Sequence, residues 1–157
     1  MRITLLCVGK TDDGQLADFV DKFRNRLKHY VPFNMVMIPD LKNTKHLRAN
    51  QQRAGEAVAI LKQLAPGDHV VLLDERGKEY RSVDFAAYLD KLMLASTQHL
   101  VFVVGGPYGF DESVYQRANS RISLSKMTFS HQMVRLFFVE QLYRAFTILR
   151  GEPYHHE

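Results

Sequence analysis

The chain has 157 residues, of which 46% are hydrophobic and 24% are charged, and its formal net charge at pH 7 is +4. These values predict a single globular domain, residues 1–157, that is long enough to bury a core. A lone cysteine, Cys7, excludes an internal disulfide, no hydrophobic run reaches membrane-spanning length, and the first residues lack a signal-peptide pattern. We therefore expect a cytoplasmic protein without a membrane segment.

Strands and helices are expected to alternate along the chain. Short hydrophobic runs predict buried strands at residues 3–8, 35–38, 70–73 and 100–104, with a short fifth piece around 122–124. Hydrophobic residues at three- and four-residue spacing predict helices at 12–30, from within 42–52 to about 64, from Ser82 as an N-cap, from Asp111, and at 132–149. This order is typical of an α/β fold with a mainly parallel sheet of about five strands and helices on both faces.

One stretch, residues 101–131, combines the features of a ligand site. A buried strand runs directly into Gly105-Gly106-Pro107-Tyr108-Gly109, where the backbone can approach a ligand without Cβ atoms in the way. A second loop, residues 123–130, follows the fifth strand, and loops that leave parallel strands form the ligand crevice of open α/β sheets. The glycines match neither a dinucleotide-binding fingerprint nor a P-loop, so the residues alone leave the chemistry open.

The last predicted helix, residues 132–149, is hydrophobic around most of its circumference. Such a helix must be buried on more than one side. In a chain of this size, the second hydrophobic side of the helix is most simply buried against a second subunit. We therefore expect a homodimer formed through this helix.

Basic and aromatic side chains are mixed in the C-terminal third of the chain. From residue 114 onward, six lysines and arginines stand against three glutamates, and three tyrosines are interleaved with them. This mixture suits RNA, because cations contact phosphates and aromatic rings stack on unpaired bases. An ordinary solvated surface would give the same pattern.

Other catalytic arrangements are weakly indicated. Ser123-Leu124-Ser125-Lys126 fits the spacing of a serine nucleophile and lysine base, but small polar residues in a loop are the commoner explanation. The seven histidines fall in no metal-ligand spacing, so we expect no metal. Asp74 and Glu75 follow a strand, but adjacent loop residues seldom face the same way, so an acid–base pair is not favoured.

A set of short motifs spread over the whole chain resembles one family. The motifs are Val8-Gly9-Lys10, Leu73-Asp74 with Gly77-Lys78, Val104-Gly105-Gly106 with Gly109, Leu124-Ser125 with Met127-Thr128, His131, Arg135, Glu140, Leu142-Tyr143-Arg144-Ala145 and Pro153-Tyr154-His155. Together they resemble the RlmH-type methyltransferases of the SPOUT class. The resemblance implies a C-terminal trefoil knot, although true knots are rare in proteins. It also implies methyl transfer from S-adenosylmethionine to N3 of a pseudouridine in a stem-loop of 23S rRNA, within the assembled ribosome.

The resemblance further implies which residues form the site. The cofactor-binding residues would be Leu73, Gly105, Gly106, Leu124, Ser125, Lys126, Met127, Thr128 and Phe129. Three residues would act on the substrate: Arg144 by stabilising charge on a uracil oxygen, Tyr154 by orienting the base, and His155 by accepting a proton. Arg144 could instead form a simple ion pair with Glu140, one helical turn away, or do both.

A single subunit of this size has little surface left for a large RNA once its cofactor is bound. We therefore expect the tail of one subunit to lie near the cofactor loop of the other. Three alternatives remain open: a SPOUT methyltransferase acting on another RNA such as tRNA, a ribosome-binding factor without catalysis, and a small-molecule nucleotide enzyme.

Overall fold

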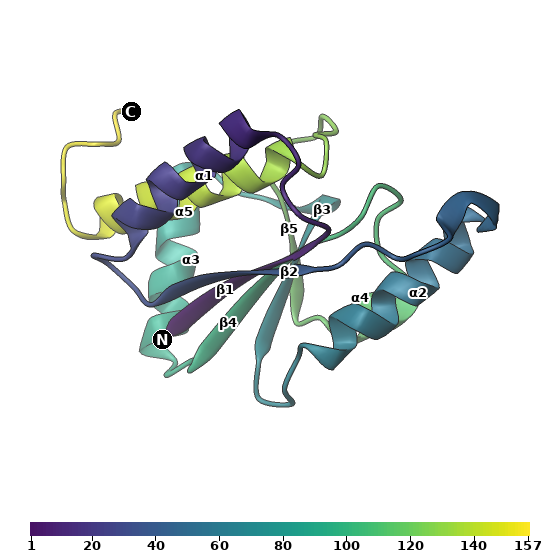
Figure 1. Cartoon of the computed structure of the whole chain (residues 1–157). Helices are drawn as coiled ribbons and strands as arrows, with labels where there is room; N and C mark the ends of the chain where they lie inside the picture. The colour runs from purple at the N-terminus through teal and green to yellow at the C-terminus, as the bar shows by residue number, and fades with distance from the viewer.

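The structure is a computed structural model that describes all residues, 1–157. Its strands and helices alternate in the predicted order (Figure 1). The strands are β1 (Arg2–Val8), β2 (Phe33–Ile38), β3 (His69–Glu79), β4 (His99–Val104) and β5 (Ser120–Ser123). The helices are α1 (Gly14–Leu27), α2 (Ala49–Lys62), α3 (Ser82–Leu94), α4 (Glu112–Arg117) and α5 (Met133–Leu149), with a 3-10 turn, η1, at Thr44–His46.

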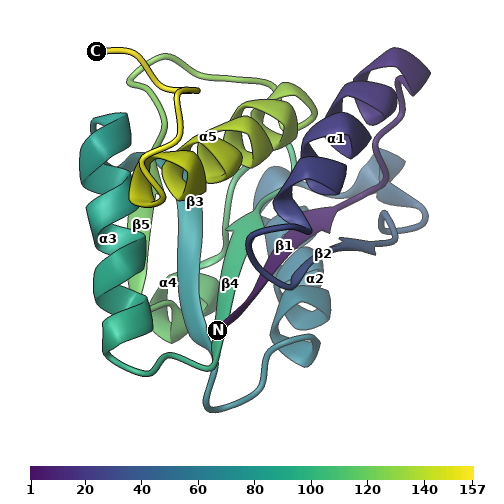
Figure 2. The same cartoon turned by 90° about the vertical axis from the view of Figure 1, so that its left-hand side faces the viewer.

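All five strands form one parallel sheet in the order β2-β1-β4-β3-β5. The central strand β4 is buried along nearly its whole length, as expected for a strand that is covered on both faces. Helices α1, α3 and α5 cover one face, and α2 and α4 cover the other (Figure 1 and Figure 2). The predicted α/β class and parallel five-stranded sheet are confirmed, whereas the trefoil knot stays a prediction.

Each face of the sheet has its own hydrophobic core. The larger core packs against α1, α3 and α5, and the ring centroids of Phe102 and Phe138 lie 4.6 Å apart in it. The smaller core lies under α2 and α4 and includes the buried side chains of Ile60 and Val114. Cys7 belongs to the larger core, where burial raises the pKa of its thiol to about 11. Its sulfur therefore serves as a small core group.

Strand β3 is longer than the sequence predicted. The prediction ended the strand at Leu73, whereas β3 continues to Glu79 through a bulge and pairs with β5 on both sides of it. Gly77 permits this arrangement, because a Cβ atom there would lie 2.7 Å from backbone atoms of Arg121 and Ile122. The bulge removes residues 74–77 from the ladder, and residues 74–76 line the cleft at the carboxyl edge of the sheet.

The start of α3 differs from the prediction by one residue. Arg81 occupies the N-cap position, so the prediction of Ser82 as the N-cap is wrong. The hydroxyl of Ser82 instead donates a hydrogen bond to Oε1 of Gln141 on α5, at 2.8 Å. The side chain that would otherwise cap the helix thereby links α3 to α5.

Helix α5 is buried on most sides but not on all of them. Phe138, Leu142 and Ala145 are at most 1% exposed, whereas Met133 and Phe137 are about 40% exposed. An apolar strip near the start of the helix is therefore left uncovered by the rest of the chain. Neither α5 nor any other helix is long and apolar enough to span a membrane.

Candidate cofactor and active site

A cleft of about 970 Å³ opens where β3, β4 and β5 end. Its walls come from the β3 bulge, the loop after β4, the loop after β5 and the start of α5. Parallel strands place their carboxyl ends at one edge of the sheet, which brings these distant segments together. The volume is typical of a pocket for a small organic ligand.

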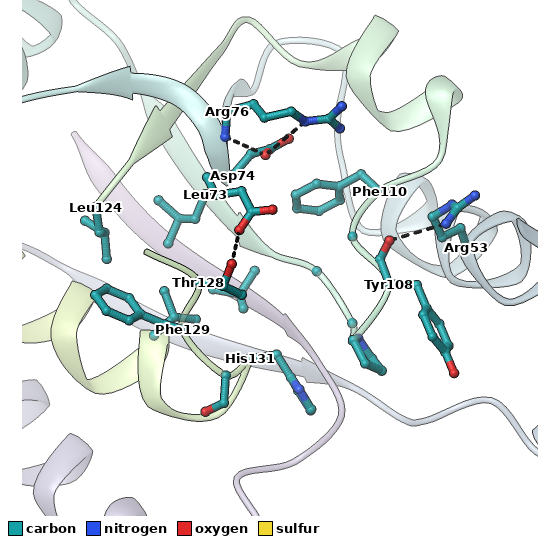
Figure 3. A pocket seen from close by; sticks show the side chains of 18 of the residues that line it. Arg53, Leu73, Asp74, Arg76, Tyr108, Phe110, Leu124, Thr128, Phe129 and His131 are labelled. Carbon is teal, nitrogen blue, oxygen red and sulfur yellow. Dashed lines mark hydrogen bonds and ion pairs between the residues drawn. The ribbon is translucent and has the colours of Figure 1, made fainter. Parts of the chain in front are cut away.

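Eight of the nine residues predicted to hold the cofactor line this cleft. They are Leu73, Gly105, Gly106, Leu124, Ser125, Met127, Thr128 and Phe129. Figure 3 shows the side chains of Leu73, Leu124 and Phe129 on the same side of the cleft, which is largely apolar there. The ninth residue, Lys126, does not line the cleft: its side chain is 87% exposed and its Nζ lies 3.9 Å from Glu79.

The loop after β5 has no regular secondary structure, and side-chain hydrogen bonds define its shape. The Ser123 hydroxyl donates to the carbonyl of Ser125 at 2.7 Å, and Ser125 Oγ accepts from the backbone N–H of Met127 at 3.0 Å. Thr128 Oγ1 donates to Oε2 of Glu75 at 2.6 Å, which links this loop to the β3 bulge. Local bonds of this kind fix a loop that the backbone alone would leave free.

Close packing explains the two glycines after β4. A Cβ atom at Gly106 would lie 2.5 Å from Oε2 of Glu56, and one at Gly105 would lie 3.1 Å from the Phe110 ring. Glu56 is only 4% exposed, and its Oε1 has no hydrogen-bond partner. Burial raises the pKa of Glu56. No sequence pattern predicts this contact, since a single glutamate within a helix carries no signal.

A charged wall of the cleft also escaped the sequence analysis. The hydroxyl of Tyr115, on α4, donates to Asp74 Oδ2 and accepts from Arg76 Nη2 at 2.9 Å. Burial and the hydrogen bond to Asp74 raise the pKa of Tyr115, so the phenol stays protonated at neutral pH. The sequence places Asp74 beside Glu75 and within a family motif, but its hydrogen-bond partner comes from a helix about forty residues away.

Arg135 fixes the start of α5, which forms one end of the cleft. Its side chain is fully buried and donates to the carbonyl oxygens of Val8 at 2.9 Å and His131 at 3.1 Å, and to Thr11 Oγ1 at 3.1 Å. His131 and Val134 both line the cleft. The buried guanidinium therefore ties this wall to the end of β1.

The residues predicted to act on the substrate form a separate cluster near the other end of α5. Arg144 Nη2 donates to Glu140 Oε1 at 2.5 Å, so the expected ion pair is present. Tyr154 donates to the same oxygen at 2.8 Å, and His155 Nδ1 lies 3.1 Å from Arg144 Nη1. The pKa of Tyr154 is raised, mainly by burial and also by the hydrogen bond to Glu140. Glu140 thus holds the helix and the tail together.

This cluster does not reach the cleft of its own chain. Neither Arg144 nor the tail residues line the cleft, and Arg144 follows Val134 by a rise of about 15 Å along α5. The Nε of Arg144 is buried and has no hydrogen-bond partner. Nowhere in the chain do three or more histidine, cysteine, aspartate or glutamate side chains form a group that could hold a metal ion.

The geometry defines an α/β protein with a small-molecule cleft at the carboxyl ends of three parallel strands. A family model described as "Predicted SPOUT methyltransferase" matches residues 1–155. The chain belongs to this family of methyltransferases, as the sequence motifs indicated.

Named relatives match the chain over its whole length. It is 58% identical over 157 residues to "Ribosomal RNA large subunit methyltransferase H" of Parabacteroides distasonis, with all of both chains covered. It is 57% identical over 156 residues to the protein of the same name from Christiangramia forsetii, with 99% of both covered. A solved structure, a probable methylase family protein from Haemophilus influenzae Rd KW20, has a TM-score of 0.54 at 12% identity and covers 99% of this chain and 70% of that one. At that identity the likeness concerns the fold alone.

Proposed function

We propose that this chain is an S-adenosylmethionine-dependent methyltransferase that acts on N3 of a pseudouridine in a stem-loop of 23S rRNA, within the assembled ribosome in the cytoplasm. The observation that carries the proposal is that one cleft, at the ends of three strands, contains eight of the nine residues predicted to bind the cofactor. The names of relatives at 57–58% identity over nearly the full length support large-subunit rRNA as the substrate.

The residues of the cleft fit the proposed cofactor, which would supply a methyl group carried on a positively charged sulfur. Leu73, Leu124 and Phe129 offer an apolar surface for an adenine ring. Asp74 and Glu75 offer negative charge to a ligand that carries positive charge. The glycines after β4 let the backbone approach the ligand closely.

Arg144, Tyr154 and His155 have properties that suit the substrate side of the reaction. Methyl transfer requires N3 to be deprotonated and aligned with the methyl group. The guanidinium of Arg144, whose side chain is 24% exposed, can stabilise negative charge on a neighbouring uracil oxygen. Tyr154 stays protonated and can orient the base, and His155 can accept the N3 proton. Because alignment supplies much of the rate, methyl transfer depends only in part on this proton acceptor.

A homodimer would bring the two groups of residues together. Met133 and Phe137 leave an apolar strip uncovered on α5. A second cavity of about 280 Å³, lined by Phe85, Phe129 and Phe137 among others, adjoins this strip and the cofactor loop. A twofold contact through α5 would fill this cavity and carry the tail of one chain toward the cleft of its partner. We propose that each active site is built from both chains.

Radiolabelled S-adenosylmethionine tests this proposal directly. The purified protein is incubated with assembled ribosomes or with naked 23S rRNA, both from cells that lack the modification. We expect label in the pseudouridine-bearing stem-loop, and more of it with ribosomes. Absence of label with both substrates, despite cofactor binding in calorimetry, would contradict the proposed substrate and direct the search to tRNA. Absence of cofactor binding would contradict the methyltransferase assignment of the cleft.

A further inference from the structure

A basic segment, residues 41–55, borders the cleft on the side opposite the cofactor loop. It comprises the connection from β2 to α2 and the first turns of α2. Because β2 is parallel to the other strands, this connection leaves the same edge of the sheet as the cleft loops. Arg53 lines the cleft and donates from Nη1 to the carbonyl of Tyr108 at 3.5 Å. Figure 3 shows Arg53 and Tyr108 across the cleft from Phe129.

The charge of this basic segment is unbalanced. It carries Lys42, Lys45, Arg48 and Arg53 but no aspartate or glutamate. The first three side chains are exposed, and none of the four takes part in an ion pair. Helix α2 has no acidic side chain in its first turn, so the partial positive charge of its N-terminus adds to that of the cations. The cations and the helix N-terminus together favour a polyanion along this segment, which the exposed Asp40 and the buried Glu56 flank.

The positions of these cations indicate a ligand larger than the cofactor. Lys42, Lys45 and Arg48 lie outside the lining of the cleft, so a molecule that contacts them and also enters the cleft must extend beyond it. At the rim itself, Tyr108 is 52% exposed beside Arg53. An exposed aromatic ring next to a cation suits an unpaired base, whose face can stack while neighbouring phosphates contact lysines and arginines.

We infer that the basic segment is an RNA-binding surface. Lys42, Lys45 and Arg48 bind backbone phosphates beside the target nucleotide, and Arg53 with Tyr108 receives an unpaired base at the rim. The inference rests on the proposed function for the identity of the RNA, and it assigns residues that the cofactor and the substrate-side cluster do not use. It also gives the RNA a contact on the rim of the cleft opposite the cofactor loop.

Removal of the three exposed cations tests the inference. The variant Lys42→Ala/Lys45→Ala/Arg48→Ala is compared with Arg2→Ala/Lys62→Ala/Lys91→Ala. The control removes the same residue types from exposed positions at the start of β1 and at the ends of α2 and α3, where the opposite edge of the sheet lies. Three quantities are measured: the affinity for S-adenosylmethionine by calorimetry, the methylation kinetics with large ribosomal subunits that lack the methyl group, and the salt dependence of binding to those subunits.

For the first variant we expect the KM for the subunits to rise about tenfold or more near 0.15 M salt, with kcat and cofactor affinity unchanged. The slope of log affinity against log salt should fall by about two to three, since each phosphate contact contributes close to one. The control should change KM by less than about twofold. Equal KM values and equal salt slopes for both variants would overturn the inference. The salt slope tests the RNA-binding surface even if the protein binds RNA without methylating it. The inference and the proposed function can therefore fail separately.

Discussion

At the scale of single residues, the carboxylate of Glu56 leaves no room for a side chain at position 106. Adding a single methyl group there should therefore disturb the cleft. We expect Gly106→Ala to weaken S-adenosylmethionine binding about tenfold or more, or about 1.4 kcal/mol. The reason is that a Cβ atom 2.5 Å from Glu56 Oε2 forces the loop after β4 to shift. Calorimetry with the purified variant measures the change.

Two further variants separate this effect from a general effect of alanine. Gly67→Ala is the matched control, because a Cβ atom at Gly67 meets nothing within 4 Å. The double variant Gly106→Ala/Glu56→Ala removes the opposing carboxylate and should recover part of the lost affinity. Equal losses in the single and double variants would contradict the explanation.

Glu56 itself should make stability depend on pH. Burial raises its pKa in the folded protein above the ordinary value of 4.5. Its contribution to stability is therefore fully present below about pH 4.5 and is lost as pH rises through the raised folded-state pKa. Glu56→Gln has nearly the same shape but does not ionise. We expect the free energy of unfolding of the variant to rise relative to that of the wild type as pH increases from about 4 to about 8, because only the wild type must ionise a buried carboxyl.

Urea unfolding at several pH values measures this difference. Asp18→Asn, at an exposed position on α1, is the control. Its free energy of unfolding should change with pH nearly as that of the wild type does. A difference between Glu56→Gln and the wild type that stays constant over the whole pH range would rule out the buried carboxyl as its cause.

Arg144 is the substrate-side residue whose loss should slow catalysis most. We expect Arg144→Ala to lower kcat about a hundredfold, because one donor to a developing negative charge is removed. Cofactor affinity should not change, since the proposed contact of Arg144 is with the uracil base and not with the cofactor. Arg150→Ala, at an exposed position about 1.7 turns further along, is the control. Full turnover of Arg144→Ala would end its proposed role.

At the scale of helices and strands, Arg135 connects α5 to β1 through a buried charge without a carboxylate partner. We expect Arg135→Met to lower the free energy of unfolding by about 2–4 kcal/mol, because carbonyl groups of both elements lose their donors. Arg2→Met, at an exposed position where the side chain makes no hydrogen bond or ion pair, should change it by less than about 0.5 kcal/mol. Urea unfolding measures both values, and similar small losses would show that the buried contacts contribute little.

The order and type of the elements could be predicted because hydrophobic periodicity is a local property of the sequence. The end of β3 could not, because charged residues such as Asp74 and Glu75 suggest a turn, and only pairing with β5 extends the strand to Glu79. Ser82 failed as an N-cap for a similar reason, since Gln141 on a distant helix binds its hydroxyl. Tertiary contacts override local preference in both cases.

The residues that we propose to bind the cofactor follow from the family motifs, and their meeting in one cleft follows from the parallel strands. The Tyr115–Asp74–Arg76 cluster and the contact of Glu56 with Gly106 had no such signal, because each joins elements far apart in the sequence. The sequence also could not predict that the side chain of Lys126 points into solvent, because a motif does not show the direction of a side chain.

At the scale of the whole molecule, an active site shared between chains predicts complementation. Arg144→Ala changes only the substrate side of a site, and Gly106→Ala changes only its cofactor side. A heterodimer of the two variants contains one site with both changes and one site with neither. We expect an equimolar mixture, after subunit exchange, to regain about a quarter of wild-type activity, because about half of the dimers are heterodimers with one intact site.

Methylation assays before and after subunit exchange measure the recovery. A mixture of Arg144→Ala with itself should regain nothing. A mixture of the two variants that stays at the mean of the separate activities would place the whole site within one chain and contradict the shared arrangement.

The burial of Cys7 gives the protein a built-in chemical probe. Strand β1 lies between β2 and β4, and a thiol with a pKa of about 11 that is closed to solvent does not react with alkylating reagents in the folded state. Alkylation therefore requires the sheet to open, so its rate reports the opening equilibrium in the way that amide exchange does. Any molecule that binds only the folded chain must slow the reaction. The rate of modification of one native sulfur can therefore rank cofactor analogues and RNA fragments without a label on either molecule.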